Sequence, residues 1–450
     1  MKKIRYNRYV ELVESNTDKF ILNNLITNDI YAVSKTAVEK IDEYIKEGKI
    51  ESEAIKRDIS QLYCSGFLID DSISEEDEIA AMHAKIDSDS ISPLGTVYFM
   101  PTLACNFRCV YCVIGTQIEK NQNKTCDRYM DDETIIQSAK YIVNEALEKG
   151  RKELKIILFG GEPSLAVKQN LLLMKTVNEL VKAHNDALKV GYLMISNGYA
   201  LNEKVIDELM ENGLVHVQVT LDGNKETHDR RRFFINGSGT FEKIVENMKM
   251  LATKKLSIAL RVNVDQDNCD SIEDLLRYIK EENLAERIGV QFAPTDPSDF
   301  STNTGYTTEV LSKFDHYYEV AASCGISFWP WQRHCSLNDD GFYAIAPTGE
   351  IYKCPTCVGI EGLAVGSVYD KELKQMPERY RTVSDRCERC EYYPACKGGC
   401  LPMRDGANLP DFCFKEANST IKKTFLKNKY GKSNVDIARD RLKEMVMQFY

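Results

Sequence analysis

The segment CNFRCVYC spans residues 105–112 and follows directly on an apolar run, TVYFMPT, that begins at Thr96. The run is short and rich in β-formers, so it predicts a strand, and the cysteines then lie on the loop after it. Thiolates at Cys105, Cys109 and Cys112 can bind three irons of a 4Fe-4S cluster and leave the fourth iron open. Zinc normally takes four tetrahedral ligands and no fourth ligand stands nearby, so a zinc knuckle or buried free thiols are weaker interpretations.

Apolar runs of this kind alternate with longer amphipathic segments across residues 93–300. The runs begin at Thr96, Leu154, Lys189, Val215, Ser257 and Ile288. They are almost continuously apolar, which is typical of parallel strands buried on both faces. Helical periodicity fills the segments between them, as at 132–149 and 202–212. The alternation predicts an α/β fold, a partial (β/α)6 TIM-like barrel, whose functional loops meet at the carboxyl ends of the strands.

Polar motifs follow several of these strands, at the end where the functional loops are expected. They are Gly160-Gly161-Glu162-Pro163, Ser196-Asn197-Gly198, Thr220-Leu221-Asp222-Gly223, His228-Asp229-x-x-Arg232, and Asn263 within the fifth strand. Glycines let the backbone approach a ligand closely, and the Glu162 carboxylate can accept from an ammonium group. The first motif alone is also compatible with a tight turn, Asp222 and Asp229 with turn caps, and His228 with a structural hydrogen bond. Asn263 suits a ribose hydroxyl or the backbone equally well.

With the three cysteines and these motifs, the β/α region resembles the radical S-adenosylmethionine (SAM) superfamily. The resemblance implies that Cys105, Cys109 and Cys112 hold a 4Fe-4S cluster whose open iron binds SAM, and that SAM is cleaved to a 5′-deoxyadenosyl radical. It also implies a set of SAM-binding residues, with Glu162 at the amino group and Tyr111 beside adenine. Ser196 and Arg232 would hold the carboxylate and ribose region. The full set is Tyr111, Gly160, Gly161, Glu162, Pro163, Ser196, Asn197, Asp222, Arg232 and Asn263.

A second cysteine-rich region comprises Cys335, Cys354, Cys387, Cys390, Cys396, Cys400 and Cys413. A zinc ribbon accounts for only four of these, from Cys387 to Cys400. The order and spacing resemble the SPASM domain, which implies two auxiliary 4Fe-4S clusters and three clusters in all. By that resemblance, one auxiliary cluster takes Cys335, Cys354 and Cys400, and the other takes Cys387, Cys390, Cys396 and Cys413.

The first auxiliary set is one ligand short. Some SPASM proteins have a cysteine slightly upstream, where this chain has Trp329 and Trp331. Cys357 or Cys324 can complete the set, or the site stays open for a substrate thiolate. Three other cysteines have no metal-binding spacing and are expected to be buried structural thiols: Cys64, Cys126 and Cys269.

The remaining segments suggest further domains. Residues 1–70 read as a winged-helix-like α+β unit, with strands near 5–13 and 19–25 and helices at 35–47 and 51–64. Residues 71–92 are acidic and Ser-rich, which favours a solvated linker that has room for one helical turn in its middle. We expect a bridging region at 301–334, the SPASM domain at 335–415, with a hairpin at FYAIAPTGEIYKC, and two C-terminal helices at 416–450.

Composition limits the classes of function. The net charge of −10 disfavours nucleic-acid binding, since phosphate recognition depends on clustered basic residues. The chain has no long apolar run for a membrane span and no secretory signal, so a cytoplasmic location is expected. In that reducing compartment, 15 cysteines indicate metal binding or catalysis rather than disulfides.

The N-terminal unit resembles the small domain, similar to the pyrroloquinoline quinone chaperone, that binds the leader of ribosomally made precursor peptides. Together the three parts resemble radical SAM peptide maturases, and thioether-forming sactipeptide and ranthipeptide synthases fit best. The implied partners are a cysteine-containing precursor, with its leader on the N-terminal domain, and a flavodoxin or ferredoxin as electron donor. Alternatives are a maturase that forms carbon-carbon links, an anaerobic sulfatase maturase that makes formylglycine, and a non-catalytic iron-sulfur redox-sensing regulator. Sulfatase maturases place a basic aspartate after the cysteine that matches Cys354, whereas this chain has Pro355.

Overall fold

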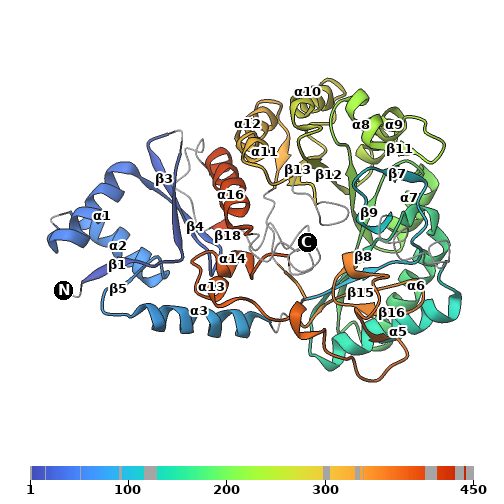
Figure 1. Cartoon of the computed structure of the whole chain (residues 1–450), viewed down its shortest axis with the longest axis horizontal. Helices are drawn as coiled ribbons and strands as arrows, with labels where there is room; N and C mark the ends of the chain where they lie inside the picture. The colour runs from blue at the N-terminus through green and yellow to red at the C-terminus, as the bar shows by residue number, and fades with distance from the viewer. Residues whose placement is uncertain are drawn as a thin grey trace.

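The computed structural model describes residues 3–15, 17–50, 52–90, 94–115, 129–296, 305–329, 335–337, 339–400, 413–430 and 440–441. A small N-terminal α+β domain lies on one side of the molecule and a β/α barrel on the other (Figure 1). Helix α16 (Lys415–Tyr430) stands between them, next to the cysteine-rich region.

Six parallel strands build the barrel in chain order: β6 (Leu94–Phe99), β8 (Glu153–Leu158), β9 (Lys189–Ser196), β10 (Leu214–Thr220), β12 (Ser257–Val264) and β13 (Gly289–Pro294). All neighbouring pairs among them are parallel. The predicted α/β class and the six strands are therefore confirmed. Parallel pairing places the carboxyl ends of all six strands at one end of the barrel, where the polar motifs were found.

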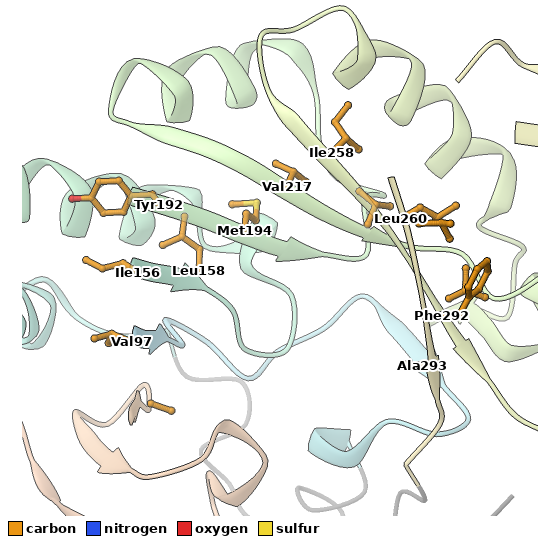
Figure 2. Close-up of a cluster of buried hydrophobic side chains, with 14 of the residues drawn as sticks. Val97, Ile156, Leu158, Tyr192, Met194, Val217, Ile258, Leu260, Phe292 and Ala293 are labelled. Atoms are coloured by element: carbon orange, nitrogen blue, oxygen red, sulfur yellow. The ribbon is translucent and has the colours of Figure 1, made fainter. Parts of the chain in front are cut away.

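Helices cover the outside of this sheet: α5 (Asp132–Glu148), α6 (Val167–Ala183), α7 (Glu203–Glu211), α8 (Lys225–Arg231), α9 (Phe241–Ala252) and α10 (Ile272–Glu281). Side-chain caps fix where several begin, because Asp131 accepts from the Thr134 amide and Asn202 from the Val205 amide. Between helices and sheet lies an apolar core to which every barrel strand contributes buried side chains (Figure 2). The core holds the strand ends in fixed relative positions.

The cysteine-rich region is joined to the barrel through the same sheet. Strand β15 (Phe342–Ile345) pairs in parallel with β6, and the hairpin continues through β16 (Glu350–Tyr352) to β17 (Ala364–Ser367). The hairpin expected from the sequence is present. Its addition to the edge of the barrel was not predicted, and it brings the second set of cysteines toward the barrel.

The N-terminal domain has five strands where two were expected. Strands β2 (Val10–Glu14), β3 (Lys19–Asn24) and β4 (Asp29–Ser34) form an antiparallel sheet, while β1 (Ile4–Tyr6) pairs with β5 (Leu68–Asp70). Helices α1 (Lys35–Glu47) and α2 (Glu53–Cys64) pack on it through a separate apolar cluster. The single strand predicted over 5–13 is thus divided in two.

The acidic segment 71–92 is not a solvated linker, because Glu75–Ser90 forms helix α3. Met82 is fully buried, and the buried Glu78 accepts from Arg5 at 2.7 Å. Ile79, Met82 and Ile86 recur at helical spacing and pack on the core. The acidic composition concealed this apolar stripe in the sequence.

The bridging and C-terminal segments also differ from expectation. The helix predicted near 308–324 is divided at Lys313 into α11 (Thr308–Ser312) and α12 (Phe314–Ser323), which leads into a short strand, β14 (Ser327–Phe328). After α16, Asp440–Arg441 forms a strand, β18, that pairs antiparallel with β4. The prediction of a second C-terminal helix is therefore wrong at these two residues. No helix among the described residues is long and apolar enough to cross a bilayer.

Helix α16 connects the two halves of the molecule. Ser419 donates to Glu11 of β2 at 3.2 Å, while Lys427 forms an ion pair with Asp315 of α12 at 2.6 Å. On the same helix Lys422 is only 2% exposed, and its ammonium donates to the Asn28 side chain at 3.3 Å. Burial lowers the pKa of Lys422 from 10.5 to about 8, although nearby Glu11 opposes the shift. Burying this cation therefore costs stability at neutral pH.

We predict that Lys422→Met raises the free energy of unfolding by about 2–3 kcal/mol at pH 7, since each pKa unit corresponds to about 1.4 kcal/mol. Between pH 8 and 10.5 the unfolded state binds more protons at Lys422, so the wild type gains stability as pH rises. The advantage of the variant should therefore disappear by about pH 10.5. Urea unfolding across this range measures both effects. The half-exposed Lys423→Met is the control, and an advantage that persists above pH 11 would contradict the assignment.

Candidate active site

The first three cysteines lie on the loop that leaves β6 at the carboxyl end of the barrel. Within this loop, β7 (Phe107–Cys109) pairs antiparallel with β11 (Arg232–Phe234), which opposes Cys109 to Arg232. The thiols are close enough to influence one another. Burial is the main cause that raises the pKa of Cys105 to about 12 and of Cys109 to about 11, and neighbouring Cys112 adds to both.

The Gly160–Glu162 loop is fixed to the cysteine loop by backbone contacts. Gly161 N–H donates to Thr102 O at 3.0 Å, and Glu162 N–H donates to Ala104 O at 2.9 Å. A Cβ on Gly160, whose φ is +126°, would lie 2.3 Å from Thr102 O, and one on Gly161 would lie 2.2 Å from Leu103 O. The sequence suggested that these glycines admit a ligand. In the structure they admit the backbone that carries the cysteines.

Glu162 is the centre of a buried hydrogen-bond network and is 1% exposed. Its carboxylate accepts from Ser164 N–H at 2.9 Å, Ser196 Oγ at 2.7 Å and Asn197 N–H at 2.6 Å. The Asn197 side chain in turn donates to Asn106 Oδ1 at 2.8 Å, beside Cys105. A carboxylate has about four acceptor positions, so room for about one more donor remains. Pro163, also buried, begins the short helical turn Pro163–Leu165 that follows.

A second network surrounds the hydroxyl of Tyr111. Tyr111 donates to Asp222, and it accepts from Arg232 at 2.6 Å and from Asn263 at 3.1 Å. Asp222 also accepts from Asn263 N–H at 3.0 Å. Burial raises the pKa of Tyr111 well above its usual value, so the phenol keeps its proton. The structure thus brings together four sequence-predicted residues from four different segments.

The histidine and aspartate of the fourth motif hold the backbone. The amide of Asp222 donates to His228 Nδ1 at 3.2 Å, and the other ring nitrogen bonds Thr240 Oγ1 at 3.1 Å. Burial lowers the pKa of His228 well below its usual value, which keeps the ring neutral. Asp229 accepts from the amides of Thr240 and Phe241. Both residues therefore have structural roles, as the alternative interpretation proposed.

Sequence reasoning missed the buried pair Arg231–Asp265, which packs against the Tyr111 ring. The two side chains form paired 2.7 Å hydrogen bonds, and the Arg231 guanidinium lies 5.1 Å from the centre of the Tyr111 ring. Asn268 donates to the carbonyls of Asp222 and Asn263, which ties two strand ends together. The available signal was Asp265, a carboxylate directly after the strand that ends at Val264.

The second cysteine region forms two groups. Cys357 is fully buried, and the hydrogen-bonded thiol of Cys354 is the first cause that raises its pKa, with Cys400 and Cys335 contributing. Burial raises the pKa of Cys396 to about 12, with Cys413, Cys387 and Cys390 contributing. The structure therefore gathers four cysteines in each group and places Cys357 in the set that was one ligand short.

The other cysteines stand apart from these groups. Cys324 is buried near Arg277 of α10, whose pKa a Cys324 thiolate would raise. It is not among the cysteines that influence Cys357. Cys269 is buried as expected, whereas Cys64 is exposed, so a buried structural role is wrong for Cys64. Trp329 packs on Gly289 of β13. Cys126 and Trp331 lie outside the described residues.

These groups fit iron-sulfur clusters. Thiolates are the ligands that such clusters take, and metal binding releases the protons that the raised pKa values retain. In the described part of the chain no three His, Cys, Asp or Glu side chains converge as ligands of a single metal ion. Cluster ligation differs, because each thiolate binds its own iron atom and the sulfurs stay apart. The networks beside the first group offer an acidic acceptor and an aromatic ring. They also offer two buried donors, Arg232 Nε and Ser164 Oγ, that have no partner among the described residues. This set matches an amino acid joined to a nucleoside.

The second group of four cysteines adjoins the N-terminal domain. Tyr392 donates to Glu11 of β2 at 3.1 Å, and Arg8 donates to the Arg389 carbonyl at 3.0 Å. The rings of His83 on α3 and Tyr393 lie 5.3 Å apart. The N-terminal domain is therefore packed directly against the cysteine-rich region.

Comparison with known proteins agrees with this arrangement. Residues 99–279 match the model of the Radical SAM superfamily. The cysteine-type anaerobic sulfatase-maturating enzyme of Clostridium perfringens is 24% identical over 358 residues, which cover 70% of this chain and 90% of that protein. The radical SAM cyclopropyl synthase TigE of Paramaledivibacter caminithermalis is 21% identical over 448 residues, 89% of this chain and 90% of that protein.

Among solved structures, Streptococcus suis SuiB bound to the precursor peptide SuiA superposes with a TM-score of 0.52 at 14% identity. The match covers 93% of this chain and 100% of that one, so the likeness of fold includes the N-terminal domain. The chain therefore has a radical SAM domain, and enzymes of that superfamily use SAM and a 4Fe-4S cluster.

We predict that Cys357→Ala lowers the iron bound after anaerobic reconstitution, because one thiolate of a four-cysteine group is lost. The loss should reach up to about four iron atoms, the content of one 4Fe-4S cluster. Iron and sulfide analysis measures it. Cys324→Ala removes an equally buried thiol beside Arg277 and should leave the iron unchanged. Iron loss in the Cys324 variant alone would reverse the assignment.

Proposed function

We propose that this protein is a radical SAM enzyme that modifies a ribosomally made precursor peptide. The observation that carries the proposal is the convergence of three thiols and two buried polar networks at the carboxyl end of one barrel. The match of residues 99–279 to the superfamily supports it. A redox-sensing regulator without catalysis would have no use for the Glu162 and Tyr111 networks.

In this proposal Cys105, Cys109 and Cys112 hold the radical-generating cluster, and each group of four cysteines holds an auxiliary cluster. Glu162 accepts from the amino group of SAM through its remaining acceptor position, and Arg232 and Ser164 supply donors to the carboxylate and ribose. Tyr111 lies beside adenine, with its hydroxyl held by Asp222 and Asn263. When bound, SAM and the clusters supply a 5′-deoxyadenosyl radical and an acceptor for one electron. The buried side chains around them exclude water from that chemistry.

The N-terminal domain is proposed to bind the leader of the precursor. An extended peptide binds such a domain by adding a strand to a sheet edge. The edge of β4 is suited to this, because it already pairs with the two residues of β18, Asp440 opposite Ile30 and Arg441 opposite Asp29. Because this domain contacts Tyr392 and α16, a leader bound there would lie near the cysteine-rich region.

The proposed product is an intramolecular thioether between a peptide cysteine and a carbon atom. The radical removes one hydrogen from that carbon, the thiol releases a proton, and the new carbon-sulfur bond leaves one electron for an acceptor. Each link therefore loses two hydrogens. Cys357 completes the group with Cys335, Cys354 and Cys400, so both auxiliary sites offer four thiolates. This favours electron transfer at these sites over binding of the substrate sulfur.

Carbon-carbon bond formation is the second candidate. It is favoured by the likeness to a cyclopropyl synthase, which extends over 89% of this chain. Formylglycine formation is less favoured although a sulfatase-maturating enzyme is among the relatives. Pro355 follows Cys354 here, and proline has no side-chain group that could accept a proton.

Tandem mass spectrometry of the treated precursor tests the proposed reaction. We expect a loss of two hydrogens per link, with fragments that join a cysteine to another residue, and one 5′-deoxyadenosine formed per link. Alkylation of every precursor cysteine beforehand should abolish the loss. If the loss survives alkylation, the thioether is excluded and carbon-carbon formation takes its place. If no 5′-deoxyadenosine forms under reducing anaerobic conditions, the whole proposal fails.

Hydrogen-deuterium exchange tests the leader site. Full-length precursor and isolated leader should both slow backbone exchange at β4, residues 29–34, because an added strand pairs with its edge. Exchange at Asp440–Arg441 should become faster as β18 is displaced. The core peptide without its leader is the matched control and should change neither segment. Protection confined to the barrel would show that the leader binds elsewhere.

A further inference from the structure

The β7–β11 ribbon has two faces with different chemistry. Paired residues share a face, so Cys109 and Arg232 lie on one side together with the packed rings of Phe107 and Phe234. This face points inward, because Phe107 is 3% and Arg232 7% exposed. The outward face carries the alternate residues of both segments: Arg108, Val110, Phe233 and Ile235. Cys109 and its outward-facing neighbours Arg108 and Val110 therefore lie on one short stretch of backbone.

The outward face is unusually apolar for an exposed ribbon. Val110 is 56% exposed and Ile235 54%, and they lie at opposite ends of the ribbon, where Val110 bonds to Arg231 and Ile235 to Asn106. Phe233 lies between them and is half-buried. Exposed apolar side chains that gather in one place commonly mark a binding surface for another protein.

Two exposed arginines accompany these apolar residues. Arg108 lies opposite Phe233, with its guanidinium against the carbonyls of Cys105 and Phe107 at 3.0 and 2.8 Å. Arg230 is exposed in the last turn of helix α8, two residues before β11 begins. Neither forms an ion pair with any residue that the structure describes, whereas the chain as a whole has a net charge of −10. Arginine and aromatic residues around an apolar centre are enriched in protein interfaces, and a positive patch favours an acidic partner.

We propose that this outward face of Arg108, Val110, Phe233 and Ile235, together with the neighbouring Arg230, is the docking surface of a small acidic one-electron carrier protein of the flavodoxin or ferredoxin class. The inference rests on the proposed function, which requires an electron from outside. A carrier seated here would contact the short stretch of backbone that carries Cys109. One electron leaves the reduced carrier and enters the cluster held by Cys109, and no bond forms or breaks.

The test compares binding and electron transfer in the reconstituted full-length chain. Arg230→Glu and Ile235→Asp should each weaken binding of an oxidised flavodoxin by about ten-fold or more at low salt, measured by biolayer interferometry. Reduction of the enzyme by reduced flavodoxin, followed by the loss of cluster absorbance, should slow to a similar extent. Reduction by titanium(III) citrate should be unchanged, because this small reductant needs no docking surface.

Matched controls lie elsewhere on the barrel. Val215→Asp changes an apolar residue that is 54% exposed on β10, and Lys204→Glu makes the same charge change on α7. Both should keep wild-type affinity for flavodoxin. Unchanged flavodoxin binding in the Arg230 and Ile235 variants would overturn the proposal, as would a change of oligomeric state in place of weaker binding. If the wild type does not cleave SAM after reduction by titanium(III) citrate, the proposed function is refuted instead.

Discussion

The backbone contact between two loops at the carboxyl ends of β6 and β8 is the constraint on which the site depends. Gly161 and Glu162 donate to carbonyls of the segment that leads into Cys105, at a separation that no side chain on Gly160 or Gly161 would permit. The parallel register of β6 and β8 brings the two loops to the same level. Backbone hydrogen bonds therefore position the loops that carry the thiols and the Glu162 carboxylate. Backbone is less mobile than side chains, so the relative position of the two loops is well defined.

From this contact the polar networks extend around the barrel. Glu162 connects to Ser196 and Asn197 on the next strand, while Tyr111 connects the cysteine loop to Asp222, Arg232 and Asn263. The buried pair of Arg231 and Asp265 supports the Tyr111 ring. Buried networks of this kind are rigid only when their members are satisfied, and among the described residues Arg232 Nε and Ser164 Oγ have no partner.

Two elements, β15 and α16, connect the barrel region to the domains around it. Strand β15 extends the barrel sheet into the cysteine-rich region, and α16 contacts both the N-terminal sheet and α12. The N-terminal sheet, the cysteine-rich region and the barrel are thus linked by direct contacts. A precursor bound at β4 would be presented to the barrel from a fixed direction, which is a positioning effect rather than a chemical one.

The sequence by itself determined the six barrel strands and the position of the first three cysteines, because apolar periodicity and cysteine spacing are local signals. Through the family resemblance it also named several members of both polar networks, but not Ser164, Asn106 or the pair of Arg231 and Asp265. It could not determine the fourth member of the first auxiliary set, since Cys357 joins Cys335 and Cys400 only after the β15–β17 hairpin has folded. It also missed helix α3, the exposure of Cys64, and the pairing of β18 with β4. In each case the outcome depends on which surface of another element is available for burial. Contacts between residues distant in the chain decide this, and a single sequence does not record them.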